Sequence, residues 1–332
     1  MTSIKRRDFL VAGALGLAAA GLPSLARGAE EGAAPFKTVL KKALIRPRLT
    51  PEVVKTLKEN GYPGVELQDK TVTEAEARAA RRLAEDEGLQ IHSFMGGWFM
   101  FNAHEAAKRK AELEKAKQNI RIAKAYGAPV ILIVPGRVNG MPMPKPSEFR
   151  LSFDPKTLML SRAAEADYPE YVQAQNDATK FAQDAMAELA PLAAELGVVI
   201  GLENVWNNLW VMPDFASAFI RSFRNAWVKA YLDLGNHARY AAAEKWVDAL
   251  SDQIVKLHIK DFKIDRAAKN EGTFVRIGDG SIDWPRVRRM IEFVGYNGWV
   301  SIESSGWTDA EHSEIMDRFF NGSLKGGAGL AV

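Results

Sequence analysis

The sequence predicts an α/β fold, a single-domain (β/α)8 TIM barrel, and three observations support this prediction. Short β-branched runs alternate with amphipathic stretches, a pattern typical of a parallel sheet covered by helices. Eight such units follow one another, which favours a closed barrel over an open sheet. No glycine-rich phosphate-binding motif follows the first predicted strand, which argues against a dinucleotide-binding fold.

The strands and helices of the barrel can be assigned in order. The predicted strands are Leu40–Ile45, Gly64–Leu67, Gln90–Phe94, Val130–Val134, Val198–Glu203, Lys229–Leu234, Ile254–Lys260 and Trp299–Glu303. A helix is predicted after Thr50, a good capping residue, with Pro51 at its first position. Three more cover Thr73–Glu87, Ala103–Tyr126 and Tyr168–Leu196. A glycine, the residue that most readily ends a helix, follows each of them.

The first 29 residues predict an export signal. Arg6 and Arg7 precede a short apolar stretch with small residues at its end, which is the pattern of a twin-arginine signal peptide. The stretch is shorter than the roughly 20 residues of a membrane span, so no stable membrane anchor is expected. We therefore expect the twin-arginine export machinery as a partner and a periplasmic or otherwise exported protein. The remaining chain divides into a barrel, residues 36–321, and a C-terminal tail, residues 322–332.

The charge of the chain is balanced without this predicted signal. The formal charge is +3, and the residues after position 29 contain 40 basic and 40 acidic side chains. A neutral surface gives no support for nucleic-acid binding. The chain has no cysteine, so its fold requires no disulfide in any compartment.

One long loop interrupts the regular repeat of strands and helices. Residues 136–167 follow the fourth predicted strand and contain four prolines. Their place after a strand puts them at the mouth of the barrel. A rigid surface loop explains them as well as a lid over the site or a contact in a homo-oligomer.

Four acidic or imidazole side chains lie at or near strand ends, where TIM barrels carry their active sites. They are Glu203, Asp233, His258 and Glu303, one from each of the last four predicted strands. Each alone could belong to a structural ion pair. Together they would crowd three carboxylates around one imidazole, which a cation would relieve. Hard oxygen and nitrogen ligands suit one divalent metal ion, Mn²⁺ first, or else Mg²⁺, Co²⁺ or Zn²⁺.

The chain resembles the xylose isomerase-like TIM barrels of the sugar phosphate isomerase/epimerase family, from about Phe36 to Phe320. The resemblance is carried by Gly61-Tyr-Pro-Gly-Val-Glu66, Leu202-Glu-Asn-Val-Trp-Asn207, Asp233-Leu-Gly-Asn236, His258-Ile-Lys-Asp261, Ile277-Gly-Asp-Gly-Ser-Ile-Asp-Trp284 and Gly295-Tyr-Asn-Gly-Trp-Val-Ser-Ile-Glu303. The second and fourth segments are most similar to the hexulose-phosphate isomerase and ribulose-phosphate 3-epimerase branch. The resemblance implies that the same four residues bind the metal.

It also implies proton transfer beside a sugar carbonyl through an enediolate. Glu203 and Glu303, on opposite sides of the sugar, would be the catalytic base and acid. Two departures from some ketose 3-epimerases concern the substrate's oxygens. Asn236 stands where they have a histidine, with His237 one residue later, and Ile264 stands where they have an arginine. Since sugar phosphates are intracellular, export favours an unphosphorylated sugar as the small-molecule substrate.

Further candidates for substrate binding lie near the strand ends. They are Glu66, His92, Trp206, Asn207, Asn236, His237, Lys260 and Asp261. For Glu66 and His92 a satisfied core position is an equal alternative, and barrel-rim packing is an alternative for Trp206. Lys260 and Asp261 could instead form a pair that orients His258. His312 is expected in a helix at the surface.

Two rival functions remain open at this stage. The same enediolate can expel a group from the adjacent carbon, so a lyase that acts by β-elimination on 3-keto-glycosides is an alternative. A sugar-binding protein without catalysis is the other alternative, although the four intact ligand positions argue against it.

Overall fold

The computed structural model describes residues 35–160 and 167–327. The predicted signal peptide, part of the long loop and the last five residues of the tail lie outside the described residues. The chain divides into two units, Met1–Pro35 and Phe36–Val332, and the description below concerns the second. Among the helices of the described residues, none is long and apolar enough to cross a membrane.

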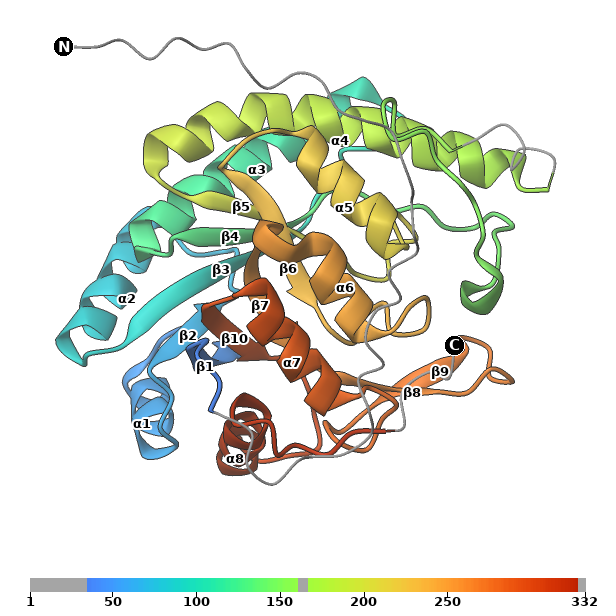
Figure 1. Ribbon diagram of the computed structural model, residues 1–332. Coiled ribbons are helices and arrows are strands. Elements are labelled where there is room, and N and C mark those ends of the chain that lie inside the picture. Colours follow the sequence, from blue (N-terminus) through green and yellow to red (C-terminus); the bar gives the residue numbers. More distant parts are fainter. Residues whose placement is uncertain (1–34, 161–166, 328–332) are drawn as a thin grey trace, which may run out of the picture. The chain divides into compact units, whose positions relative to one another are not determined.

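The predicted TIM barrel is confirmed, since eight parallel strands close into a ring (Figure 1). Around the barrel the strands follow the order β1-β10-β7-β6-β5-β4-β3-β2. Their bounds are β1 Leu40–Arg46, β2 Gly64–Leu67, β3 Gln90–Trp98, β4 Val130–Val134, β5 Val199–Glu203, β6 Val228–Asp233, β7 Ile254–Ile259 and β10 Gly298–Ile302. The third strand extends four residues beyond its predicted end at Phe94, and the other bounds differ from prediction by at most one residue.

Helices lie around this ring (Figure 1). They are α1 Pro51–Glu59, α2 Glu74–Asp86, α3 Ala106–Tyr126, α4 Pro169–Leu196, α5 Pro213–Ser222, α6 Ala243–Leu250, α7 Trp284–Val294 and α8 Asp309–Phe320, with 3-10 turns η1 Pro146–Glu148 and η3 Ser251–Gln253. The predicted cap of α1 is confirmed, because the Thr50 hydroxyl accepts a hydrogen bond from the Val53 amide. The predicted glycine stops are confirmed too, with Gly127 and Gly197 in the left-handed region at φ 72° and 67°.

The register of the last strands places the polar side chains at one level of the barrel. Asp233 on β6 pairs with His258 on β7, and His258 pairs with Ser301 on β10. Glu203 on β5 pairs with Tyr231 on β6. Because alternate residues of a strand point to the same side, Glu303 shares the inner face of Ser301. The barrel interior is therefore polar toward its carboxyl end.

A β-hairpin that the sequence reading did not predict follows β7. Its strands are β8 Asp261–Ile264 and β9 Gly272–Val275, which pair antiparallel to one another. Glu271, at the start of β9, is buried and accepts hydrogen bonds from Ser147 of η1 and from Arg266. Gly272 is required there, because a Cβ would lie 2.3 Å from the Lys263 carbonyl oxygen. The hairpin thus ties the long loop to the mouth of the barrel.

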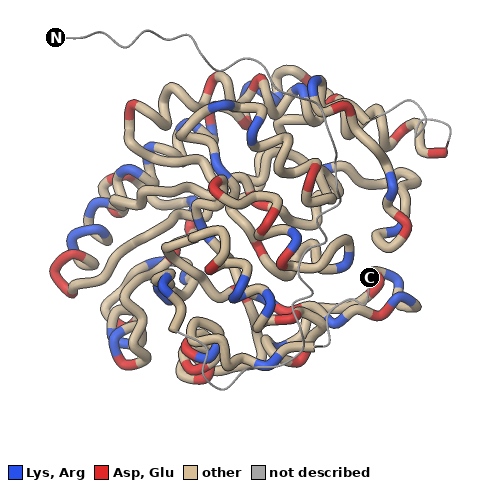
Figure 2. The backbone as a smooth tube through the Cα atoms, in the orientation of Figure 1, with Lys and Arg blue, Asp and Glu red and all other residues tan. Residues whose placement is uncertain are grey.

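Acidic and basic side chains are interspersed over the described chain (Figure 2). Most of the ion pairs join neighbouring turns of one helix or adjacent elements, such as Arg81 with Glu85 and Lys58 with Glu87. Such exposed pairs contribute typically below about 1 kcal/mol each. The mixed charge agrees with the balanced composition.

Candidate metal centre

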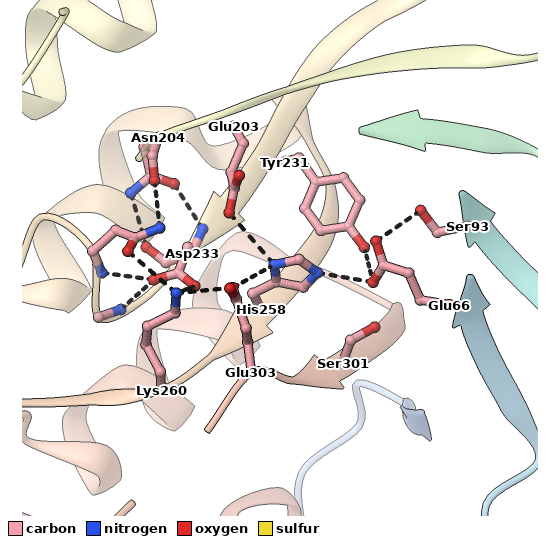
Figure 3. A network of polar contacts seen from close by, with 12 residues as sticks. Glu66, Ser93, Glu203, Asn204, Tyr231, Asp233, His258, Lys260, Ser301 and Glu303 are labelled. Atoms are coloured by element: carbon pink, nitrogen blue, oxygen red, sulfur yellow. Dashed lines mark hydrogen bonds and ion pairs between the residues drawn. The ribbon is translucent and has the colours of Figure 1, made fainter. Parts of the chain in front are cut away.

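Four side chains converge at the carboxyl end of the barrel (Figure 3). Glu203 ends β5, Asp233 ends β6, His258 lies in β7, and Glu303 directly follows β10. One ligand atom from each residue lies within 4.8 Å of the others, a spacing that a single metal ion could bridge. Asp233 and His258 are buried, whereas 39% of the Glu303 side chain is exposed. The group is therefore reachable from the barrel mouth through Glu303.

The tautomer of His258 follows from its inner neighbour, Glu66. The Nε2 atom of His258 lies 2.8 Å from Glu66 Oε2, to which the Tyr231 hydroxyl also donates at 2.7 Å. A carboxylate can only accept, so Nε2 carries the hydrogen in the neutral ring. The other nitrogen, Nδ1, then presents a lone pair to Glu203 Oε1 at 3.5 Å and to Glu303 Oε2 at 3.3 Å. A lone pair facing two carboxylates is repulsive unless a proton or a metal ion lies between them.

Three atoms of this group lack a hydrogen-bond partner although they are buried. They are Asp233 Oδ2, His258 Nδ1 and Glu303 Oε2. The Lys260 ammonium lies near two of them, Asp233 Oδ2 at 3.3 Å and Glu303 Oε2 at 2.8 Å. Buried polar atoms are nearly always satisfied, so three such atoms on neighbouring side chains fit a cation between them. Three carboxylates and one imidazole suit a hard divalent ion. The residues present therefore fit a metal ion, which Glu203, Asp233, His258 and Glu303 would hold.

Asp233 is held so that one oxygen remains available. Its Oδ1 accepts hydrogen bonds from the backbone amides of Gly235 at 2.9 Å and Asn236 at 2.6 Å. Asn204 fixes the backbone of Asp233 on both sides, accepting from its amide at 2.7 Å and donating to its carbonyl at 2.8 Å. Oδ2 has no hydrogen bond and contacts only the ammonium of Lys260, at 3.3 Å. The loop after β6 thus orients one carboxylate oxygen toward the centre.

Lys260 supplies positive charge beside the carboxylates. Its Nζ lies 2.8 Å from Glu303 Oε2 and donates to Asn236 Oδ1 at 3.2 Å. Burial opposes the charge of Lys260, but Asp233 and Glu303 outweigh it and raise the pKa of the ammonium. The lysine therefore stays protonated at the edge of the group.

Burial and mutual contact shift the ligands' proton affinities in different directions. Burial raises the pKa of Glu203 to about 7. Burial would lower the pKa of His258, yet Glu66, Glu203 and Glu303 together outweigh it and raise that pKa well above its usual value. For Glu303 burial is outweighed by His258 and Lys260, which lower its pKa to about 2. The metal-free group thus carries protons that a cation must displace.

The structure corrects the substrate-binding prediction for Glu66 and His92. Both side chains are fully buried. Glu66 accepts hydrogen bonds from Ser93, Tyr231 and His258, so it orients the imidazole from inside the barrel. His92 contacts the Ser301 hydroxyl at 3.0 Å and stacks on the Trp299 ring at 4.8 Å. Both side chains therefore lie in the core, Glu66 with its hydrogen bonds made and His92 with its Nδ1 atom without a partner.

The prediction is also wrong for Asn207 and His237, which hold loops in place. Asn207 is 1% exposed, and its Oδ1 accepts a hydrogen bond from the Leu209 amide. His237 is 1% exposed, and its Nε2 contacts the Val205 carbonyl at 2.8 Å. Both side chains fix the loop after β5 rather than reach into the mouth of the barrel.

Asp261 likewise has a structural role, and it does not pair with Lys260 to orient His258. Its buried carboxylate accepts hydrogen bonds from the amides of Phe262, Gly278 and Gly280 and from the indole of Trp284. A Cβ at Gly280 would lie 2.0 Å from Asp261 Oδ1, so only glycine fits there. The Gly-Asp-Gly segment noted in the sequence is thus explained by the anchoring of Asp261.

Of the remaining candidates, Lys260 and Asn236 lie at the group, and Trp206 lies beside it. The Trp206 indole donates to the Asn236 carbonyl at 2.6 Å and stacks under the guanidinium of Arg239, 3.9 Å from its ring centre. Phe274 of the hairpin contacts the same ring at 5.0 Å between centroids. Trp206 therefore belongs to an aromatic wall of the mouth.

The sequence reading missed Asn204 and Tyr231. Tyr231 precedes Asp233 by two residues, so both point inward from β6. That spacing was visible in the sequence and could have identified Tyr231. The partner of Tyr231, Glu66, comes from β2 on the far side of the ring, and only the closed barrel brings them together.

A pocket of about 540 Å³ lies beside the metal group, and Glu303 is the ligand residue that lines it. Lys260 and residues of β1, β9, the β10–α8 loop and the start of α8 line the rest. The volume lies within the range of roughly 300–1,000 Å³ that is usual for small-molecule sites.

The fold and this site define a class of protein, and sequence comparison names the family. The family described as Xylose isomerase-like TIM barrel matches residues 54–318, so the chain belongs to it. Two curated relatives match less of the chain. The inosose dehydratase of Glaesserella parasuis is 28% identical over 159 residues, 42% of this chain and 50% of the relative. The uncharacterized protein MJ1311 of Methanocaldococcus jannaschii is 25% identical over 144 residues, 40% and 46% of the two chains. The chain thus spans about half the length of the curated relatives it matches.

Solved structures share the fold over nearly their whole length. A D-tagatose 3-epimerase-like protein has a TM-score of 0.65 at 17% identity, covering 85% of this chain and 98% of its own. The 3-keto-D-glucoside 4-epimerase of E. coli has a TM-score of 0.58 at 16% identity, covering 85% and 98%. A xylose isomerase-like TIM barrel protein from Mycobacterium smegmatis, in complex with magnesium, has a TM-score of 0.58 at 17% identity, covering 87% and 98%. At these identities the likeness concerns the fold.

Proposed function

We propose that this protein is a divalent-metal-dependent isomerase or epimerase that acts on an unphosphorylated sugar through an enediolate. The observation that carries the proposal is the convergence of Glu203, Asp233, His258 and Glu303 within 4.8 Å. Support comes from solved structures of similar fold, which include a D-tagatose 3-epimerase-like protein, a 3-keto-D-glucoside 4-epimerase and a xylose isomerase-like protein in complex with magnesium. Mn²⁺ is the ion we propose first.

The chain's own carboxylates would move the proton. A bound divalent ion would supply charge stabilisation to the enediolate oxygens. Glu203 and Glu303 reach His258 Nδ1 from two different strands, β5 and β10. A sugar between them would present one face of its reacting carbon to each carboxylate. One carboxylate would take the proton and the other would return it, as an epimerisation requires.

Lys260 would replace the groups that are missing relative to some ketose 3-epimerases. Its ammonium lies between Glu303 and Asn236 and lines the pocket. There it would donate a hydrogen bond to a substrate oxygen on which negative charge develops. Ile264, at the position of the missing arginine, instead pairs with Gly272 in the hairpin.

The charges of the pocket support an unphosphorylated substrate. Two cations line it, and both are paired with carboxylates: Arg46 with Asp309, and Lys260 with Asp233 and Glu303. A phosphate is usually bound by cations that are free to pair with it. Export through the twin-arginine machinery, proposed from residues 1–29, would likewise place the protein away from sugar phosphates.

Proton NMR in D₂O tests the proposal directly. The Mn²⁺-loaded protein would act on ketoses, aldoses and 3-keto-glycosides, and the ion would be removed by a chelator before spectra are recorded. We expect deuterium at a carbon beside the carbonyl, together with a new isomer, and neither in protein kept metal-free. The proposal fails if no sugar in the panel exchanges a proton.

A lyase is the second candidate, favoured by the relative named inosose dehydratase. The same proton abstraction would then be followed by loss of a hydroxyl or alkoxyl group from the next carbon. In the NMR experiment this reaction gives an unsaturated product and a released water or aglycone. Tight binding of an unaltered sugar would instead support the binding-protein alternative.

A further inference from the structure

The pocket beside the metal group extends well beyond the four ligands. From Lys260 and Glu303 it continues past Ser304 and Ser305 to Trp307 and the first turns of α8. We call this outer part, lined by Arg46, Ser304, Ser305, Trp307, Asp309 and His312, the distal subsite. β1 and β10 are hydrogen-bonded neighbours, so Arg46 and Ser304 belong to adjacent strand ends.

Two polar atoms of the distal subsite are buried without a partner. They are Nε2 of His312 and Nε1 of Trp307. His312 is 5% exposed, so the prediction of a surface histidine is wrong. Burial lowers the pKa of His312, which keeps the imidazole neutral, with one donor and one acceptor. Unsatisfied buried groups are rare, and both residues line the pocket, so a small rotation of either side chain would present its nitrogen to a ligand there.

The chemistry of this subsite suits a neutral, hydroxyl-rich ring. The Arg276 guanidinium lies over one face of the Trp307 ring, 4.4 Å from its centre. The opposite face and the indole donor remain, the combination on which sugar rings stack. Ser304, Ser305 and His312 add hydrogen-bonding groups that match hydroxyls. Arg46 is already paired with Asp309, so an anion would find no free charge. The amino terminus of α8 is also closed to anions, because Thr308 and Glu311 form a capping box there.

The size of the pocket points in the same direction. Its volume of about 540 Å³ is in the range for ligands larger than one small ring. Trp307 also lines a second pocket, of about 340 Å³, toward Arg318 and Lys325. The pocket of about 540 Å³ beside the metal group therefore has room for more than one sugar ring.

We infer that the distal subsite binds a second sugar ring, so that the substrate is a glycoside or disaccharide rather than a free monosaccharide. The inference rests on the proposed function only for the place of the reacting ring, at the metal group. Trp307 would stack on the second ring, and His312 would form a hydrogen bond to one of its hydroxyls.

Binding measurements test this without turnover. Isothermal titration of the wild-type protein kept metal-free, in which no turnover is expected, compares each monosaccharide with a disaccharide that contains it: D-fructose with isomaltulose and with maltulose, and D-glucose with maltose and with cellobiose. We expect at least one disaccharide to bind roughly tenfold more tightly than its monosaccharide, the gain typical of one or two added hydrogen bonds. If no disaccharide in any pair binds more tightly, the inference is wrong.

Variants assign the gain to particular side chains. His312→Leu and Trp307→Phe should each remove most of the gain for the disaccharide while leaving the monosaccharide's affinity within about twofold. Trp98→Phe is the matched control, since Trp98 is an exposed tryptophan that does not line this pocket. Either variant alone carries the test if the other does not fold. Equal loss for both sugars, or no loss, would overturn the inference.

The outcome is separable from that of the proposed function. If the NMR experiment shows no proton exchange but the disaccharide gain depends on His312 and Trp307, the proposed reaction is wrong and the subsite stands. If exchange occurs on monosaccharides and the disaccharide gain is absent, the reaction stands and the subsite is wrong.

Discussion

The two sides of the His258 ring differ in how completely their hydrogen bonds are made. On the inner side Nε2 contacts Glu66, whose oxygens also accept from Tyr231 and Ser93, and all four side chains are fully buried. On the rim side Nδ1 faces Glu203 and Glu303 without a hydrogen bond. On the inner side the buried polar groups are hydrogen-bonded to one another, which fixes one orientation of the His258 ring. The rim side is stabilised only when a cation or protons bind there, which is typical of a functional site.

The largest effect is expected from the rim itself, with Glu203→Gln. The amide keeps the size of the side chain but can neither take a proton nor bind the metal as a carboxylate. General acid–base catalysis alone contributes about 10²–10⁴-fold, so we expect turnover to fall at least about a thousandfold. Deuterium exchange by NMR measures the loss, and circular dichroism shows whether the fold is retained.

The matched control for this change is Glu195→Gln, at an exposed position near the end of α4. It makes the same chemical substitution far from the strand ends and should leave exchange unchanged. Full activity in Glu203→Gln would show that the rim carboxylate is not needed. The difference between the two sides of His258 would then have no consequence for catalysis.

Lys260 is cationic and lies at the rim, so changing it should affect metal binding and turnover in opposite directions. Lys260→Met should lower turnover by about 10²–10³-fold, as does removal of one donor to a developing charge. It should also tighten metal binding, because an ammonium 3.3 Å from Asp233 Oδ2 repels a cation. Titration with Mn²⁺ and exchange kinetics measure the two effects. Weaker metal binding in this variant would contradict the assigned role, and Lys260→Arg is the charge-preserving control.

The rim could be predicted from the sequence, whereas the contacts of the inner side could not. Glu203, Asp233 and Glu303 each close a short apolar run, and strand ends in a barrel share one rim. Glu66 also follows such a run, but its contact with His258 depends on strands β2 and β7 facing each other across the ring. That pairing belongs to the closed barrel and its register. Spacing along the chain therefore does not decide whether Glu66 is a core residue or binds the substrate.

The β8–β9 hairpin shows the same limit of sequence reasoning. A run of strand character from Ile254 to Lys260 predicts one strand, and the chain indeed turns away after Ile259. The reason is Asp261, whose carboxylate is held by three backbone amides and Trp284. An aspartate beside a metal-ligand histidine suggests a site residue. Only the position of Gly278 and Gly280 reveals its structural role.

An inner-side variant, Glu66→Gln, should act through the metal. Losing the charge that orients His258 typically lowers metal affinity about 10–100-fold, and turnover at saturating metal should change less. Tyr231→Phe removes one hydrogen bond to the same carboxylate and is expected to have a smaller effect in the same direction. Titration with Mn²⁺ measures the metal affinity of both variants and shows which of them loses more. A changed KM for sugar with unchanged metal affinity would instead restore the substrate-binding interpretation of Glu66.

The effect that joins both sides of His258 is the pH dependence of metal binding. The pKa of Glu203 is raised to about 7 and that of His258 is raised above its usual value, so both hold protons at and below pH 7 in metal-free protein. A metal ion must displace them, and its apparent affinity should therefore rise with pH through 7 and above, by about tenfold per pH unit for each proton released.

Calorimetric titration with Mn²⁺ at pH 6, 7 and 8, in two buffers of different ionisation enthalpy, counts the released protons. In Glu66→Gln the inner carboxylate no longer favours protonated His258, so the rise in affinity should move to lower pH. Tyr231→Phe keeps the charge of Glu66, so the pH at which metal affinity rises should stay nearly unchanged. An affinity that is independent of pH between 6 and 8 would mean that the rim is already deprotonated, and the inner side would then orient His258 without controlling its charge.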